Sequence, residues 1–218
     1  MTVRLAVFDC DGTLVDGQSS ICEAMEQAFG QFALAAPDRA TIRRAVGLSL
    51  PQAVRGLLPD ADADLQRRVV DAYKQAFREA RLAGHLSQPL FDGVIPLLDA
   101  LRADGWVLGV ATGMSDRGLT HCLATHGITD RFVTLQTADR HPSKPHPAML
   151  EAALFEAAAE AAHTVMIGDT VFDMAMARDA GVRGVGVDWG YHEPDELRDA
   201  GADFVAGTID ELQGYLLR

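Results

Sequence analysis

The chain has 218 residues and, with histidine taken as neutral, a formal net charge of −12 at pH 7. This charge argues against non-specific binding to nucleic acid or anionic lipid, because both attract basic surfaces. Hydrophobic residues make up 48% of the chain and charged residues 23%, a composition typical of a folded globular protein rather than a disordered one. At about 150 residues per domain, the length fits one large domain or a core with an insert.

The cysteines and the lack of export signals lead us to expect a cytoplasmic protein. The three cysteines, Cys10, Cys22 and Cys122, are odd in number and lack metal-type spacing, which indicates a reducing compartment. The apolar stretches are too short or too charged to cross a membrane. The chain does not open with the basic, apolar and small-residue series of a signal peptide. We therefore expect neither a membrane nor a nucleic acid among its partners.

The first strand is predicted at residues 4–8, where a short apolar run precedes a polar turn. From about residue 90 onward, strand-like and helix-like segments alternate. Strands are expected at 107–111, 132–136, 164–167, 182–187 and 204–205, and helices at 96–103, 116–126, 147–162, 171–180 and 194–200. Such alternation indicates a parallel sheet.

Residues 16–86 contain no convincing strand, whereas apolar residues recur at helical spacing over 21–32, 39–46, 51–57 and 64–82. A segment rich in Gly, Pro, Ser and Asp, 85–93, would lead the chain back to the sheet. The sequence thus predicts an α/β fold. Residues 1–15 and 87–218 would form a doubly wound, Rossmann-like parallel-sheet core, and residues 16–86 an α-helical cap domain inserted after the first strand.

Polar residues follow the predicted strands at the edge where an open parallel sheet binds its ligand. Asp9 and Asp11 come after the first strand, and Gly12 is expected to form a tight turn that directs both carboxylates toward one site. Thr112 and Gly113 come after the strand at 107–111 and precede a helix, a setting that suits a phosphate oxygen.

Lys144, Asp169 and Asp173 complete this set of polar residues. Lys144 is one of only two lysines and has prolines on both sides, while Asp169 and Asp173 would share a face if a helix begins there. Carboxylates packed closely repel one another unless a divalent cation lies among them, and oxygen ligands of this kind suit Mg²⁺. The pattern predicts phosphoryl transfer, in which metal and lysine offset oxygen charge while a carboxylate attacks.

With these motifs in this order, the chain resembles the haloacid dehalogenase superfamily, and most closely its phosphoglycolate phosphatase-like branch with a helical cap. The resemblance covers nearly the whole chain and rests on Asp9-x-Asp11-Gly-Thr, Thr112-Gly113, Lys144-Pro-x-Pro and Gly168-Asp169-x-x-x-Asp173. The four motifs together are far more specific than an isolated Asp-x-Asp-Gly, which is also a common turn sequence. The resemblance implies a Mg²⁺-dependent phosphatase that hydrolyses a small-metabolite phosphomonoester, similar to phosphoglycolate, through an aspartyl-phosphate.

The resemblance also implies a role for each motif residue. Asp9 would be the nucleophile, and Asp11 the general acid and base. Thr112, Gly113 and Lys144 would bind the phosphoryl group. Asp9, the backbone carbonyl of Asp11 and Asp169 would hold Mg²⁺, and Asp173 would orient the site.

Three features go beyond the motifs. Cys10 stands where relatives carry a bulky aliphatic residue, and we expect a small buried filler because the flanking acids disfavour a thiolate. The second motif lacks the Asn that follows the Thr or Ser in many relatives. In the cap, Arg43 and Arg44 precede residues 47–49, where relatives place a substrate-specificity loop. We hypothesise that these arginines bind a second anionic group of the substrate, the alternative being a solvated helix face.

Several other functions use similar residues. A phosphomutase would use the same groups and return the phosphoryl group to its substrate. A phospho-accepting signalling domain also gathers acids, Thr and Lys around Mg²⁺, but is shorter and is phosphorylated on a later Asp. Asp11 counts against a dehalogenase, and a phosphonate hydrolase would need a cap lysine, for which Lys74, deep in a predicted helix, is a poor candidate. The sequence leaves open the substrate and the choice between monomer and homodimer.

Overall fold

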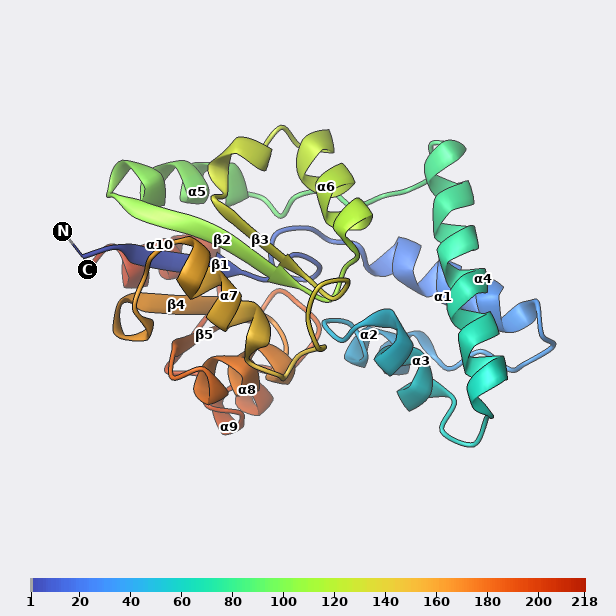
Figure 1. The fold of residues 1–218 in the computed structure, drawn as a ribbon. Coiled ribbons are helices and arrows are strands. Elements are labelled where there is room, and N and C mark those ends of the chain that lie inside the picture. The colour runs from blue at the N-terminus through green and yellow to red at the C-terminus, as the bar shows by residue number, and fades with distance from the viewer. Residues whose placement is uncertain (1) are drawn as a thin grey trace.

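The computed structural model describes residues 2–218, and at its centre is a six-stranded parallel sheet (Figure 1). The strands are β1 (Arg4–Phe8), β2 (Trp106–Thr112), β3 (Thr134–Thr137), β4 (Thr164–Gly168), β5 (Arg183–Val187) and β6 (Phe204–Ala206), in the spatial order β3-β2-β1-β4-β5-β6. The chain builds one side of the sheet from β1 outward and then crosses back to β4. This is a doubly wound sheet, which confirms the predicted α/β class.

Strand β1 lies in the middle of the sheet because its side chains are apolar on both faces. Residues 5–8 are at most 1% exposed, and alternate residues contribute to two separate core clusters. Phe8 pairs with Val110 of β2 and with Ile167 of β4. The residues that follow these three positions therefore emerge next to one another at one edge of the sheet.

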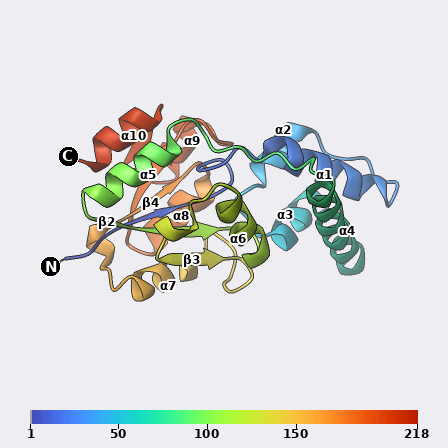
Figure 2. The ribbon, with the colours of Figure 1, turned by 90° about the horizontal axis from the view of Figure 1, so that it is seen from above.

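Helices cover both faces of the sheet (Figure 1, Figure 2). On one face, α5 (Val94–Ala103), α6 (Asp116–Thr125) and α10 (Ile209–Leu216) bury leucines in the first cluster. On the other face, α7 (Ala148–Glu156) and α8 (Val171–Asp179) contribute to the second. Helix α9 (Pro194–Asp199) packs near β5 and β6. These two layers fix the strand ends that carry the site.

The helices α1 (Gln18–Gly30), α2 (Arg39–Arg44), α3 (Leu50–Leu57) and α4 (Ala63–Leu82) pack together beside the sheet (Figure 1). They share a hydrophobic cluster of their own, which includes Phe29, Ile42, Val54 and Val69. A separate apolar core supports our proposal that residues 16–86 form a cap domain. The boundaries at 15/16 and 86/87 stay a prediction.

Two helical segments differ from the sequence-based expectation. The helix expected over 147–162 ends at Glu156, and Ala158 adopts a φ of 50°, which no right-handed helix can contain. Helix α10 was not predicted, although Thr208 accepts a hydrogen bond from the backbone N–H of Glu211 and caps its start. Within residues 2–218, no helix is long and apolar enough to span a membrane.

Candidate active site

Asp9 lies at the carboxyl end of the central strand, between β2 and β4. Its backbone N–H donates a hydrogen bond of 2.8 Å to the carbonyl of Ile167, which continues the β1–β4 pairing by one residue. The side chain is fully buried, yet it lines a cleft of about 600 Å³ between the sheet edge and helices α1–α4. The strand thus presents this carboxylate at the inner end of a ligand-sized cleft.

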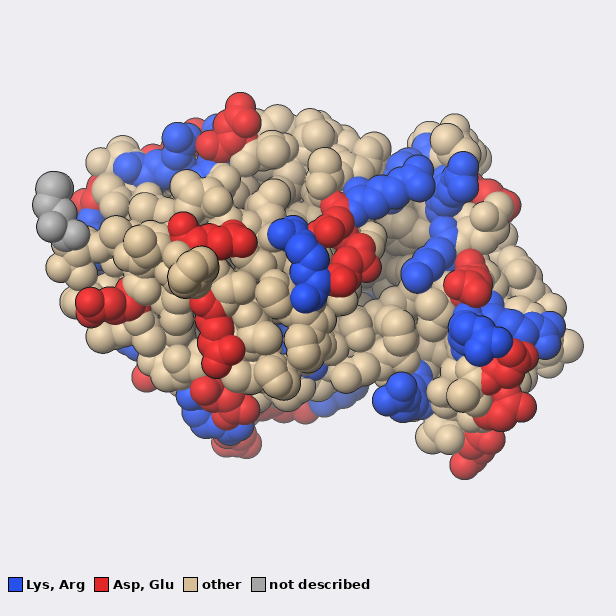
Figure 3. All heavy atoms as spheres, viewed as in Figure 1, with Lys and Arg blue, Asp and Glu red and all other residues tan. Residues whose placement is uncertain are grey.

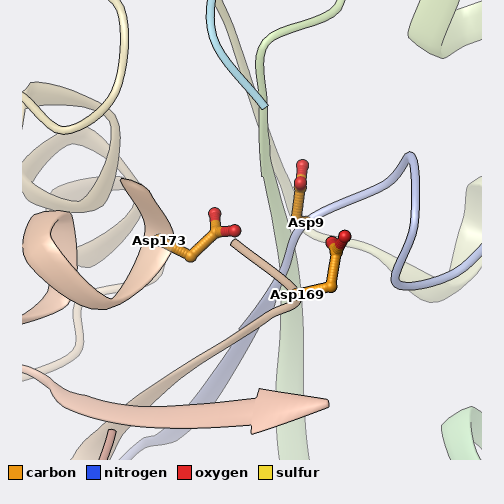
Figure 4. Close-up of side chains that lie close together, drawn as sticks. All are labelled: Asp9, Asp169 and Asp173. Atoms are coloured by element: carbon orange, nitrogen blue, oxygen red, sulfur yellow. The ribbon is translucent and has the colours of Figure 1, made fainter. Parts of the chain in front are cut away.

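Asp169 and Asp173 lie beside Asp9 and form a buried carboxylate cluster (Figure 4). One oxygen from each of the three side chains lies within 4.8 Å of the others. Asp169 follows β4 directly, whereas Asp173 lies in the first turn of α8. The structure therefore brings together acids from the first and fourth strands, as the motif spacing indicated.

Lys144 is the basic partner of this cluster. Its Nζ lies 2.9 Å from Oδ1 of Asp9 and 2.6 Å from Oδ1 of Asp173, and all three side chains are at most 1% exposed. Burial by itself would lower the pKa of Lys144, but the attraction of Asp173 and Asp9 raises it overall, so the ammonium stays protonated. One ammonium cannot balance three carboxylates.

The shortage of positive charge is visible in the pKa values of the acids. Burial, opposed by Lys144 and reinforced by Asp173, raises the pKa of Asp9 to about 7. Burial, together with repulsion by Asp9 and Asp173, raises the pKa of Asp169 well above its usual range. A further cation at this site would stabilise the charged carboxylates.

The turn after β1 places Asp169 against the first motif. Gly12 has a φ of 87°, and a Cβ there would lie 2.2 Å from Oδ2 of Asp169, so both the turn and the close approach require glycine. The Thr13 hydroxyl donates to Oδ1 of Asp169 at 2.8 Å, and the Tyr191 N–H donates to Oδ2 at 3.0 Å. The segment after β5 therefore borders the site.

Asp11 occupies a different environment, half-buried in the cleft lining. Its Oδ1 accepts a hydrogen bond of 3.3 Å from Nε2 of Gln88, a residue that the sequence analysis did not single out. Burial raises the pKa of Asp11 to about 6, while Gln88 and Lys144 oppose the shift. A carboxyl group with a pKa near neutrality can both donate and accept a proton.

Thr112 and Gly113 lie where β2 ends, at the cleft. The Thr112 hydroxyl accepts a hydrogen bond from the N–H of Met114 at 3.2 Å. A Cβ on Gly113 would lie 2.4 Å from the carbonyl oxygen of Leu48, and the N–H of Ser49 donates to Oγ of Ser143 at 2.7 Å. Residues 47–49, between α2 and α3, therefore rest directly on the loops that carry the second and third motifs.

Arg43 and Arg44, for which substrate binding was one hypothesis and a solvated helix face the alternative, contact other residues of the protein. Arg43 donates to Oε1 of Gln18 at 3.1 Å, and Arg44 forms an ion pair of 2.6 Å with Glu196 of α9. Neither belongs to the cleft lining, so these contacts do not support the expected role. Lys74 lies within the long helix α4, as predicted, and belongs to the cleft lining.

Cys10 is buried, as expected of a filler residue. Its Sγ lies 4.0 Å from Sγ of Cys122 in α6, and burial together with that contact raises the pKa of the Cys10 thiol. The thiol form is therefore favoured, and a thiolate nucleophile at this position is not.

The donor set of the cluster fits a hard divalent cation. Apart from the Lys144 ammonium 2.9 Å from Oδ1, the oxygens of Asp9 have no side-chain partner among the described residues, and Asp169 retains acceptor capacity beside Thr13 and Tyr191. Asp173 differs, because Oδ1 contacts Lys144 and Oδ2 accepts from the Thr170 hydroxyl at 2.6 Å. Two buried carboxylates with free lone pairs are ligands of the kind that Mg²⁺ takes.

Comparison with known proteins places this site in a family. The family model described as haloacid dehalogenase-like hydrolase matches residues 6–187. Probable phosphatase IndB of Dickeya dadantii (strain 3937) is 35% identical over 213 residues, covering 96% of this chain and 92% of that protein. Phosphoglycolate phosphatase of Vibrio parahaemolyticus serotype O3:K6 (strain RIMD 2210633) is 26% identical and covers 96% of this chain and 94% of its own.

A solved structure agrees with these matches. A haloacid dehalogenase-like family hydrolase from Streptococcus pneumoniae is 25% identical, with a TM-score of 0.85 over 98% of each chain. The family match spans most of this sequence, and the two curated relatives are aligned along nearly their whole length. The chain therefore belongs to the haloacid dehalogenase-like hydrolase family and is a phosphatase.

Proposed function

We propose that this phosphatase hydrolyses the phosphomonoester of a small metabolite with the help of Mg²⁺, through a phosphoryl group carried by Asp9. The observation that carries the proposal is the state of Asp9. Its carboxylate is buried at the inner end of the cleft, and its one side-chain partner among the described residues is the Lys144 ammonium, 2.9 Å from Oδ1. A buried carboxylate whose oxygens retain acceptor capacity at the end of a cleft is available for attack on a ligand and for metal binding.

Three residues are proposed to bind the phosphoryl group. The ammonium of Lys144 would offset the charge of its oxygens, as it now offsets that of Asp9 and Asp173. The Thr112 hydroxyl and the backbone at Gly113 lie in the cleft lining just before the start of α6. Hydrogen-bond donors at a helix start suit an anion.

Mg²⁺ would be held by Asp9, by the backbone carbonyl of Asp11 and by Asp169. When bound, the ion would polarise the phosphoryl oxygens and neutralise charge on them. Asp173, whose two oxygens are already engaged by Lys144 and Thr170, would hold the lysine in place rather than bind the ion. We assign Asp9 and Asp169, but not Asp173, to the ion because only their oxygens retain acceptor capacity.

The proton transfers are assigned to Asp11. As Asp9 attacks phosphorus and the ester P–O bond breaks, the protonated carboxyl of Asp11 would give its proton to the leaving alkoxide. The resulting carboxylate would then take a proton from water, which attacks phosphorus and breaks the bond to Asp9. A pKa of about 6, raised by burial, suits both steps near neutral pH.

The size of the cleft favours a metabolite over a phosphoprotein. Its volume is about 600 Å³, within the range of small-molecule sites. Residues 47–49 rest on the core at one side of the cleft, which would restrict entry of a folded partner. We propose that the cleft limits the access of water while Asp9 reacts with a small phosphate ester.

The test is phosphate release from a panel of phosphorylated metabolites with Mg²⁺, scored by kcat/KM. We expect D9N and D11N to lose at least about a thousandfold in turnover. D16N is the matched control, because Asp16 caps the neighbouring turn through Gln18 and does not line the cleft. D11N mixed with substrate should also accumulate a phosphoryl group on the peptide that contains Asp9, detected by mass spectrometry.

Other outcomes separate the alternatives. Full turnover by D9N, or activity unchanged by a chelator, would contradict the proposal. Conversion of one sugar phosphate isomer into another without release of phosphate would identify a phosphomutase. A stable phosphorylated wild-type protein without turnover would identify a phospho-accepting domain.

A further inference from the structure

Four basic side chains line the cleft. Lys74, Arg78 and Arg81 recur along α4 at helical spacing, and Arg117 lies in the first turn of α6. Figure 3 shows Lys and Arg side chains on both sides of the hollow between the core and α4. In a protein with a net charge of −12, this concentration of positive charge at the cleft favours an anionic ligand there.

These basic residues have no acidic partner. Among residues 2–218, none of the four forms an ion pair with a carboxylate, although Asp71 and Asp139 also line the cleft. Three cap arginines outside the cleft lining do form ion pairs, Arg39 with Glu26, Arg44 with Glu196 and Arg67 with Asp64. The side chains at the cleft are therefore available to a ligand.

Arg81 is the most informative of them. Its Nε is buried and has no hydrogen-bond partner among the described residues. Burial lowers the pKa of Arg81, and repulsion by Arg117 lowers it further. A desolvated guanidinium N–H without an acceptor is unfavourable, and both Arg81 and Arg117 line the same cleft, so an anion bound there would satisfy it.

Arg81 and Arg117 belong to different parts of the fold. Arg81 lies in the last turn of α4, and Arg117 lies in α6, which packs on the sheet. An anion held by both guanidinium groups would connect the cap helices to the core across the mouth of the cleft. Guanidinium groups bind carboxylate and phosphate oxygens through paired hydrogen bonds.

We propose that the substrate carries a second oxyanionic group, a carboxylate or a further phosphate, that Arg81 and Arg117 bind together. This inference rests on the proposed function, since it concerns the end of the substrate opposite the phosphoryl group attacked by Asp9. It assigns to this pair the role that the sequence suggested for Arg43 and Arg44.

The test uses pairs of phosphomonoesters that differ in the second charge. Phosphoglycolate is compared with 2-hydroxyethyl phosphate, and 3-phosphoglycerate with glycerol 3-phosphate, for the carboxylate. Fructose 1,6-bisphosphate is compared with fructose 1-phosphate and fructose 6-phosphate for the second phosphate. The quantity measured is the ratio of kcat/KM for the doubly charged ester to that for its partner, and the pair with the larger ratio identifies the anion.

We expect wild-type protein to favour the doubly charged member of at least one pair. In R81Q and in R117Q that ratio should fall about tenfold to a hundredfold, with the loss mainly in KM, because a charge-assisted hydrogen bond is removed. R81K, which keeps the charge, should recover part of the ratio. In the double variant the losses should be less than additive, because both residues bind the same group.

R67Q serves as the matched control, since Arg67 lies on the same helix, pairs with Asp64 and does not line the cleft. Equal losses for both members of a pair in R81Q, or strictly additive losses in the double variant, would overturn the shared anion site. Phosphate release without preference for any doubly charged ester would overturn it while leaving the proposed function intact. If no ester releases phosphate, the proposed function itself is refuted.

Discussion

Replacing Lys144 with Met is the most direct test of the charge balance at the site. The substitution keeps a long apolar side chain and removes the ammonium that lies 2.9 Å from Asp9 and 2.6 Å from Asp173. Removing one partner of a buried ion pair costs about 3–5 kcal/mol. For a chain of this size that corresponds to a fall in Tm of about 6–20 °C.

The cost of this substitution should depend on pH. In the folded protein the pKa of Asp9 is about 7, above the ordinary value of 3.8, so the folded state binds this proton more tightly than the unfolded state. Such a carboxyl favours folding at low pH, and that stabilisation is lost as the pH rises from 3.8 to about 7. Without the Lys144 ammonium the pKa of Asp9 should rise further, so ionising this carboxyl in the folded state costs more. K144M should therefore be destabilised more at about pH 8 than at about pH 5.

The assay is urea unfolding followed by circular dichroism, with a chelator present so that no metal substitutes for the lysine. K74M is the control, because Lys74 is exposed on α4 and forms no ion pair within residues 2–218, so the change in its free energy of unfolding should stay within about 0.5 kcal/mol. A free energy of unfolding for K144M within about 1 kcal/mol of wild type at pH 8 would refute this account of the charge balance.

Two further predictions concern how the cap region rests on the core. The buried His192 accepts a hydrogen bond from Val171 N–H through Nδ1 and contacts the Arg44 carbonyl through Nε2. Burial lowers the pKa of His192 below 6.5, so the stabilisation that the neutral ring gives should be present above that pH and be lost as the pH falls. The free energy of unfolding should therefore change less between pH 8 and pH 5 in H192Q than in wild type. The same pH dependence in both proteins would contradict the assignment. G113A would place a Cβ 2.4 Å from the Leu48 carbonyl, where ordinary contact begins at 3.4 Å. A displacement of residues 47–49 by about 1 Å should lower kcat/KM about a hundredfold, whereas G56A, whose Cβ meets nothing within 4 Å, should retain wild-type kinetics.

The architecture and the motif positions could be predicted from the sequence. Residues 5–8 and 164–167 are short apolar runs, and such runs become buried parallel strands because both of their faces must leave water. Once strands are parallel, their carboxyl ends share one edge, so Asp9, Thr112 and Asp169 had to lie near one another. Local pattern was sufficient here because each residue follows its strand directly.

The ends of helices were harder to predict. The run 152–162 is rich in alanine and carries no strong stop signal, yet α7 ends at Glu156 because the chain must turn into β4. The short helix α10 was missed, although Thr208 and Glu211 form a recognisable capping pair. For α7 the packing of the chain outweighs the local preference for helix, whereas for α10 the local signal was present in the sequence.

Only the tertiary structure decided which arginines line the cleft. In the sequence, Arg43 and Arg44 stand beside the cap loop, while Arg81 and Arg117 lie 36 residues apart without any motif. The folded chain pairs Arg44 with Glu196 and leaves Arg81 and Arg117 without acidic partners at the cleft. A side chain's charge and helical spacing are properties of the sequence, but its nearest opposite charge depends on which distant elements pack beside it, and that is determined only when the cap helices lie on the core.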